Sequence, residues 1–375
     1  MPHGNVATSK SIETSGIMTT RLLWLVPLSC PLIPILGMYL NIQTQIGLFS
    51  LLTVFMWYAL VPLADWLVGT SVRKKLGAEA QLRLEGDVYY RYVALIMVPL
   101  HYLSVVVFAW YVSTHPLTFA LLGHTISIGL ATGLAINLGH ELGHKSAHLD
   151  RLFAKLALAL SGYGHFTIEH NRGHHRNVAT PEDPASARFG ESIYSFASRE
   201  VIGNLRGAWI SERSQLAIKG KNRWGWQNEI LQPLFFTVLL YGTLVLVFGI
   251  ITLPFLFAQA ALAWWQLTST NYVEHYGLAR RKLENGRYER CGSVHSWNSD
   301  CFVSNLTLLN LQRHSDHHVH AARPYQALRN FEVVPQLPAG YPLMFLAALL
   351  PPLWRAIMDP RVLQQVGGDM KRVNC

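Results

Sequence analysis

Long apolar stretches alternate with polar segments along the chain. Each apolar stretch is long enough to cross the hydrocarbon core of a bilayer, which takes about 20 residues of helix. Very short connections join the first stretch to the second, the third to the fourth and the fifth to the sixth. The pattern therefore predicts an all-α membrane bundle of three helical hairpins, with spans at residues 22–41, 46–69, 92–112, 117–139, 229–249 and 252–272.

Lysine and arginine are confined to the segments between these hairpins. Neither residue occurs within 22–72, 92–144 or 224–279. Basic segments next to membrane spans stay on the cytoplasmic side. We therefore expect a cytoplasmic cap made of residues 140–228 and 273–375, and both termini inside.

Composition supports one membrane-embedded unit. Half of the 375 residues are hydrophobic and 14% are charged, whereas about 25% is usual in soluble domains. No linker divides the chain, so we expect a single domain, 1–375. Residues 1–20 are polar and fit a cytoplasmic tail better than a cleaved signal peptide. The apolar segment 341–358 is broken by two prolines, which favours an interfacial helix.

The net charge is +9. The topology bias and attraction to anionic membrane lipid explain most of this excess. A docking surface for an acidic protein stays open as a further reason, and no nucleic-acid partner is expected. The four cysteines form no Cys-x-x-Cys pair, so a rubredoxin-type site is absent and free thiols are expected in a cytoplasmic setting.

Nine of the 17 histidines gather in four clusters at the cytoplasmic ends of the predicted spans or in the cap. In the first cluster, His140 and His144 are one helical turn apart and share a face. The second cluster repeats this spacing, and the fourth combines spacings of three and four. The clusters are His140 and His144; His170, His174 and His175; His275; and His314, His317 and His318.

This number of imidazoles indicates a metal centre with more than one ion. Imidazole suits zinc, copper, iron and nickel, but a tetrahedral ion needs only three or four ligands. Two ions with four or five nitrogen ligands each fit nine histidines. Carboxylates beside the ligands are candidates to accept the distal N–H groups, although each is alternatively an exposed charge or a direct ligand: Glu141, Glu169, Glu274 and Asp316.

The other eight histidines are interpreted as packed or solvated residues. His148 and His320 each continue the spacing of a cluster, so these two are the alternative candidates for metal ligands. The full set is His3, His101, His115, His124, His148, His165, His295 and His320.

Two other classes of protein compete with this interpretation. Residues 140–144 also form His-Glu-x-x-His, the zinc-protease motif, but a protease would leave six clustered histidines without a purpose. A metal transporter would need ionisable residues along a path through mid-membrane, whereas these histidines crowd one edge. Both alternatives explain less of the pattern.

The boxes resemble those of the membrane fatty-acid desaturase and hydroxylase superfamily. Four segments are similar to signatures of bacterial AlkB-type alkane hydroxylases: His-Glu-Leu-Gly-His-Lys at 140–145, Glu-His-Asn-Arg-Gly-His-His at 169–175, Asn-Tyr-Val-Glu-His-Tyr-Gly at 271–277 and Leu-Gln-Arg-His-Ser-Asp-His-His at 311–318. The resemblance runs from the first span to about residue 360.

This resemblance implies six transmembrane helices and a non-haem di-iron centre in the bacterial inner membrane. It further implies dioxygen-dependent terminal hydroxylation of medium-chain alkanes, with electrons from NADH through rubredoxin reductase and rubredoxin. A desaturase or an aromatic-methyl hydroxylase of the same superfamily remains the alternative.

Two further expectations concern the surroundings of the centre. Trp57 and Tyr58 lie in the second span, where a large side chain in an apolar pocket sets its depth; packing between helices or a place in an interfacial belt is the alternative. Residues 177–191 are too polar to be buried without partners. They either fold over the metal centre or contribute to a rubredoxin dock.

Overall fold

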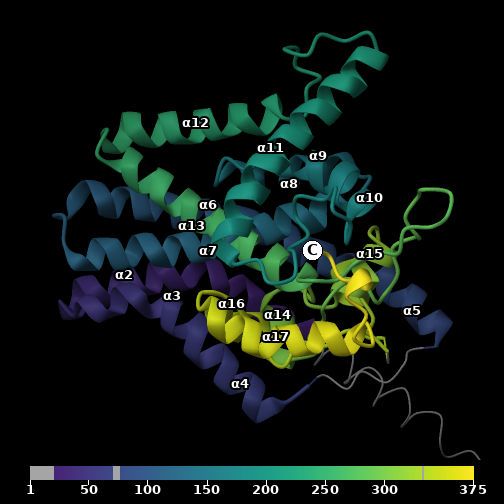
Figure 1. The fold of residues 1–375 in the computed structure, drawn as a ribbon. Coiled ribbons are helices and arrows are strands. Elements are labelled where there is room, and N and C mark those ends of the chain that lie inside the picture. Colours follow the sequence, from purple (N-terminus) through teal and green to yellow (C-terminus); the bar gives the residue numbers. More distant parts are fainter. Residues whose placement is uncertain (1–20, 71–76, 332) are drawn as a thin grey trace, which may run out of the picture.

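The computed structural model describes residues 21–70, 77–331 and 333–375. The predicted tail, 1–20, and His3 lie outside these ranges. Within them the chain is helical, and its only extended pairing consists of isolated bridges. The all-α prediction is therefore confirmed for the described residues. Figure 1 shows long helices side by side, with short helices gathered at one end of the bundle.

The long helices are α6 (Val88–Thr114), α7 (Phe119–Gly143), α11 (Ile193–Ile218), α12 (Leu231–Phe248) and α13 (Thr252–His275). The N-terminal hairpin is built from shorter pieces: η1 (Val26–Leu32), α2 (Ile33–Thr44), η2 (Gly47–Leu51), α3 (Leu52–Phe55), the π-helical turn η3 (Met56–Leu60) and α4 (Val61–Val68).

Short elements form the cap at one end of the bundle. In chain order they are α5 (Ala78–Glu85), α8 (His148–Ala159), α9 (Phe166–Glu169), the π-helical turn η4 (His170–His174), α10 (His175–Asn177), α14 (Phe302–Thr307), α15 (His314–Val319), η5 (Tyr325–Ala327), α16 (Tyr341–Ala348), α17 (Pro351–Gln365) and η6 (Met370–Arg372).

Five helical segments are long and apolar enough to cross a membrane. They run over Arg21–Thr44, Gly47–Val68, Ala78–Thr114, Phe119–Gly143 and Leu231–Phe248, and they cover the first five predicted spans. The protein is thus a multi-pass membrane protein. The sixth predicted span, 252–272, is the continuous helix α13, but polar side chains make it less apolar than the five.

The predicted interfacial segment 341–358 is two helices rather than one. Helices α16 and α17 meet at an angle of 120° at Pro351. Proline removes a backbone donor and clashes with the preceding turn, so a break is expected there. The pair taken together is apolar enough to count as a broken span.

Helix α13 lies at the centre of the bundle and packs most extensively against α7. Two glycines of α7 permit this close approach. A Cβ on Gly129 would lie 2.5 Å from the Cβ of Leu262, and a Cβ on Gly133 would lie 2.8 Å from that of Gln266. Small residues four apart let helix backbones approach in membranes. The close packing brings the C-terminal ends of α7 and α13 together.

Candidate metal centre

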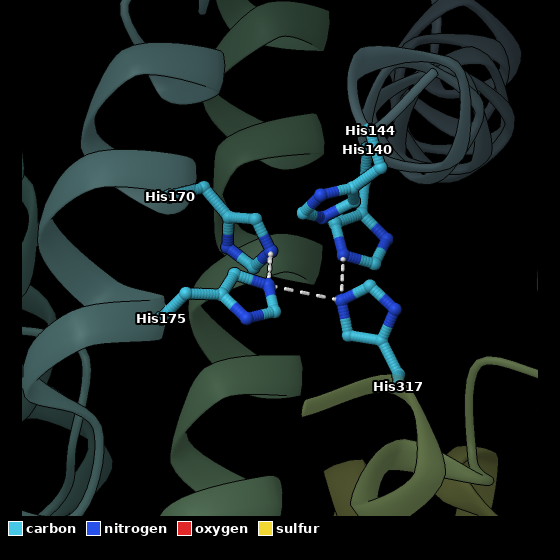
Figure 2. A group of neighbouring side chains, drawn as sticks. All are labelled: His140, His144, His170, His175 and His317. Atoms are coloured by element: carbon cyan, nitrogen blue, oxygen red, sulfur yellow. Dashed lines mark hydrogen bonds between the residues drawn. The ribbon is translucent and has the colours of Figure 1, made fainter. Parts of the chain in front are cut away.

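All nine predicted ligands meet at the cap end of α7 and α13, in two groups. The first group holds five histidines, which Figure 2 shows converging from three segments of the chain: His140, His144, His170, His175 and His317. The second group holds four: His174, His275, His314 and His318. Within each group the candidate ligand atoms lie within 4.8 Å of one another.

In the first group, ring nitrogens are in direct contact. The Nε2 atom of His317 lies 2.9 Å from Nε2 of His140 and 3.1 Å from Nε2 of His175. The His175 atom lies 3.0 Å from Nε2 of His170. Metal–imidazole bonds are about 2.1 Å long, so nitrogens around one ion lie within about 4.2 Å of each other. The five rings are therefore arranged around a space that fits one ion.

One ring nitrogen in each group tests whether these spaces fit a metal ion. Nε2 of His144 and Nε2 of His174 are buried and have no hydrogen-bond partner among the described residues. A buried polar atom without a partner costs about 1–3 kcal/mol. One such atom belongs to each group, and a metal ion in each space satisfies both. The donor set thus fits two ions.

The second box is divided between the two groups by a π-helical turn. His175 donates its backbone N–H to the carbonyl of His170, five residues earlier. This wider turn brings the rings of His170 and His175 together, whereas His174 faces the second group. His170 and His174 repeat the four-residue spacing of the first cluster but belong to different groups, because the turn between them does not have an α-helical pitch. Such π turns occur often at functional sites.

Burial favours the neutral form of several of these imidazoles. Burial in the protein, followed by the charges of neighbouring histidines, lowers the pKa of His170, His317 and His318 well below its ordinary value. The same causes lower the pKa of His175 to about 3. A neutral imidazole has a free lone pair for a metal. The rings are ready to ligate at neutral pH.

One acidic residue that the sequence interpretation did not list contacts a ligand directly. Nδ1 of His174 donates to Oδ2 of Asp183 over 2.9 Å, and Ser186 donates to the same oxygen over 2.6 Å. Burial raises the pKa of Asp183, but His174 and the two hydrogen bonds outweigh it and hold that pKa below its ordinary value. Asp183 thereby fixes the His174 tautomer that leaves Nε2 free.

Asp183 lies in the segment 177–191, which folds back on the second box. The segment is polar in sequence, yet Asp183 and Ser186 are buried, because Asp183 accepts hydrogen bonds from both Ser186 and His174. The only signal in the sequence is a pair of acids, Glu182 and Asp183, between two prolines at 181–184. Nothing in the sequence says that Asp183 is close to a histidine.

The four predicted carboxylates lie in different surroundings. Glu274 faces the second group, with Oε2 3.1 Å from Nε2 of His314. Glu141 bonds instead to Lys145 at 2.8 Å and to the backbone N–H of Tyr325 at 3.2 Å.

Asp316 also bonds away from the nine histidines. Its carboxylate accepts hydrogen bonds from His320, Arg323 and Arg329 and so holds the loop after α15. Glu169 is buried beside the second box. Burial, with the charges of Asp183 and Glu200, raises the pKa of Glu169 well above its ordinary value, which favours the neutral acid.

The seven other described histidines lie outside both groups. His148 and His320 continue the spacing of two clusters, but Nδ1 of His148 faces Arg151 and Nδ1 of His320 faces Asp316.

A narrow cavity ends at the histidines. About 50 Å³ of it is open to the centre of a water molecule, and its wall is mostly apolar. His140 and His170 of the first group and His314 of the second line it, as do Trp57 and Glu274. The remaining lining residues include Leu130, Leu134, Phe166, Leu267, Leu308, Leu311 and Phe345.

Of the two predicted pocket residues, Trp57 lines this cavity and is nearly buried. Trp57 lies in the π-helical turn η3. Tyr58 acts one step away, because its hydroxyl donates to Oε1 of Gln266 over 3.3 Å and Gln266 lines the cavity.

The fold and the site define a class of protein, and comparison with known proteins agrees. A fatty acid desaturase family model matches residues 115–347, so the protein is a multi-pass membrane protein of the fatty acid desaturase family, with histidine clusters that could hold metal ions. Within that class the chain belongs to the alkane 1-monooxygenase family.

Two close relatives carry the family assignment, and a third is more distant. Alkane 1-monooxygenase 1 of Alcanivorax borkumensis is 49% identical over 94% of this chain and 87% of its own length. Alkane 1-monooxygenase of Ectopseudomonas oleovorans is 48% identical over 94% of this chain and 88% of its own. The xylene/toluene monooxygenase hydroxylase component of Pseudomonas putida is more distant, at 28% over 56% of this chain and 55% of its own.

Proposed function

We propose that this protein hydroxylates the terminal methyl of medium-chain n-alkanes to primary alcohols, using dioxygen and two iron ions. The observation that carries the proposal is an apolar cavity that ends at histidines of both groups. The names of the relatives, alkane 1-monooxygenases, support the reaction and the substrate class.

The nine histidines are the proposed ligands of the two irons. Imidazole is a suitable ligand for iron, and the absence of thiolate from both groups argues against a zinc–sulfur or iron–sulfur site. When bound, the iron pair supplies the redox chemistry that activates dioxygen and inserts one oxygen atom into a C–H bond. Asp183 keeps His174 oriented and its Nε2 unprotonated.

The apolar wall of the cavity binds and orients the alkyl chain. An alkane dissolved in the bilayer is already in an apolar medium, so transfer into the cavity gains little free energy from the hydrophobic effect. Selectivity then depends on shape. A narrow cavity admits a linear chain end-on and presents its methyl group to the histidine end, as a positioned reaction requires.

We further propose that Trp57 sets the depth of the cavity and that Tyr58 supports it by holding Gln266. The hydrogen bond from Tyr58 holds the amide oxygen of Gln266, so that this polar atom of a cavity-lining side chain has a partner within the protein. The apolar wall also excludes water from the reacting methyl group.

The proposed source of electrons is rubredoxin, itself reduced by an NADH-dependent reductase. In the five apolar segments, lysine and arginine occur only as Arg21, Arg83 and Arg91, all N-terminal to the apolar run of their segment. The proposal places the protein in the bacterial inner membrane with α13 as a sixth span, and the positive-inside rule then favours a cytoplasmic position for these basic ends. The metal centre and both termini are then cytoplasmic, on the side where rubredoxin is found.

The test uses the purified full chain loaded with iron. We expect two irons per chain, and we expect 1-octanol when octane, isotopically labelled dioxygen and reduced rubredoxin are supplied, with the label in the alcohol. Tightly bound zinc and no oxygen-dependent product would refute the proposal. Supplying a fatty acyl substrate and xylene in parallel tests the alternatives: preferential desaturation or aromatic-methyl oxidation would reassign the substrate.

A further inference from the structure

The carboxylate of Glu274 points into the group of four histidines. Glu274 is in the last turn of α13, next to His275, and its side chain is buried. Its Oε2 atom lies 3.1 Å from Nε2 of His314. Nε2 is the atom through which His314 meets the other rings of its group, so the carboxylate oxygen lies on the metal-facing side.

Too many lone pairs converge on that nitrogen for a proton to explain the arrangement. Nε2 of His314 lies 2.9 Å from Nε2 of His318 and 3.2 Å from Nε2 of His275, in addition to Oε2 of Glu274. One proton joins one donor to one acceptor. A single cation that they share satisfies four acceptor atoms around a common space together.

The other oxygen of Glu274 is held in place by Tyr341. The hydroxyl of Tyr341 donates to Oε1 over 2.7 Å, and Tyr341 is fully buried. The backbone N–H of Tyr341 donates in turn to Oε1 of Gln312 over 2.8 Å. The hydrogen bond from the Tyr341 hydroxyl to Oε1 therefore fixes the Glu274 carboxylate so that Oε2 is the oxygen directed at the histidines.

The number of ligands and the balance of charge both favour Glu274 as a direct metal ligand. The first group offers five nitrogens and the second only four, and a carboxylate oxygen makes the second group five as well. Neutral imidazoles do nothing to balance the charge of two buried cations, and burying uncompensated charge is costly. A carboxylate directly on one ion supplies negative charge where it is most effective.

We propose that Glu274 is the fifth protein ligand of the metal ion held by His174, His275, His314 and His318, binding through Oε2, and that Tyr341 is its positioning residue. The inference rests on the two-metal centre proposed above but not on the identity of the substrate. It assigns Glu274 a direct bond to the metal, in contrast to the hydrogen-bonding role that Asp183 has beside His174.

Glu141 provides a matched control. It too is a glutamate next to a histidine ligand at the end of a long helix, but its carboxylate binds Lys145 and the backbone of Tyr325 rather than a ring nitrogen. The same substitution at the two positions removes the same charge. Only one of the two changes should alter the metal.

The experiment loads the metal-free full chain with Co(II), whose d–d absorption reports on its ligands, and compares parent, Glu274→Gln and Glu141→Gln. We expect parent and Glu141→Gln to bind two ions with the same spectrum. In Glu274→Gln the spectrum should change, and one site should bind more than about 100-fold more weakly, beyond the 10–100-fold cost of losing an outer partner. Helix content by circular dichroism checks that each variant folds.

Tyr341→Phe gives a second measurement that does not depend on the folding of the glutamate variant. It keeps the carboxylate but removes the hydroxyl that holds it, so we expect the spectrum to shift less than in Glu274→Gln. An unchanged Co(II) spectrum in Glu274→Gln would overturn the role of Glu274, whatever its affinity. Failure of the parent to bind two ions would instead refute the two-metal centre.

Discussion

Replacing Asp183 by asparagine should weaken one of the two metal sites while leaving the fold intact. The two residues have the same shape, but asparagine offers a donor where aspartate has two acceptors. Oδ2 of Asp183 now accepts from His174 and Ser186, and Oδ1 accepts from the backbone N–H of Ala185 over 3.1 Å. Either orientation of the amide therefore sets a donor against a donor.

When the amide nitrogen faces His174, the imidazole can relieve this conflict only by changing tautomer, whereas in the other orientation the conflict is with the backbone N–H of Ala185. If Nδ1 of His174 gives up its proton and accepts from the amide, Nε2 carries the proton and its lone pair is lost to the metal. Loss of an outer partner of a metal-bound histidine typically costs 10–100-fold in affinity, which corresponds to about 1.4–2.8 kcal/mol. We expect Asp183→Asn to lie within that range.

The assay is a titration of the metal-free protein against a chelator of known affinity, followed by measurement of octane hydroxylation. Glu182→Gln is the matched control, because Glu182 is the neighbouring acid and its carboxylate meets only the hydroxyl of Tyr288, at 3.4 Å, on the exposed surface. Equal affinities for both metals in Asp183→Asn and Glu182→Gln would refute the reasoning about the tautomer.

Three further predictions concern the cavity, the bundle and pH. Trp57→Ser should extend the range of accepted alkanes to longer chains, and a product profile equal to the parent's over an alkane series would contradict the role of Trp57. Gly129→Ala should lower the Tm, because the added methyl is forced against Leu262 at a cost of about 1–3 kcal/mol. The control is Gly242→Ala, whose added methyl meets nothing within 4 Å and should not lower the Tm. Thermal unfolding in detergent compares the two variants. Burial lowers the folded-state pKa of histidines such as His170, so below about pH 6.5 the unfolded chain binds more protons than the folded protein. The Tm of the metal-free protein should therefore fall as the pH drops from about 7.5 to about 5.5. A Tm that does not change over this pH range would contradict the prediction.

The ligands could be found from the sequence because chemistry and hydropathy mark them together. A membrane span ends where polar residues begin, so the sequence predicts that His140 and His275, at the ends of α7 and α13, lie at one edge of the bundle. The division of the nine ligands into five and four could not be found in the same way. It depends on the pitch of the helix between His170 and His175, and a π turn has no simple sequence signature.

The partners of the ligands were harder to predict than the ligands themselves. Adjacency in sequence does not give the direction of a side chain. Glu141 and Glu274 both lie next to a histidine ligand, yet one carboxylate turns to Lys145 and the other to His314. Asp183 contacts His174 from nine residues away, through a loop whose path is set by packing against the bundle. Helix α13 is less apolar than its neighbours because it lines the cavity and the metal site.

The π-helical turn at His170–His174 accounts for a difference between two boxes of the sequence. In α15 an ordinary helical turn places His314 and His318 in one group of histidines and His317 in the other. The second box has one more residue between its first histidine and its final pair, and the wider turn takes up that residue, so that its three histidines divide between the groups in the same way. The π-helical turn thus compensates for the extra residue of the second box. A chain shortened by one residue between His170 and His174 should therefore form an α-helical turn and keep the same division of ligands. An alignment that penalises such a gap would separate two motifs that divide their histidines in the same way.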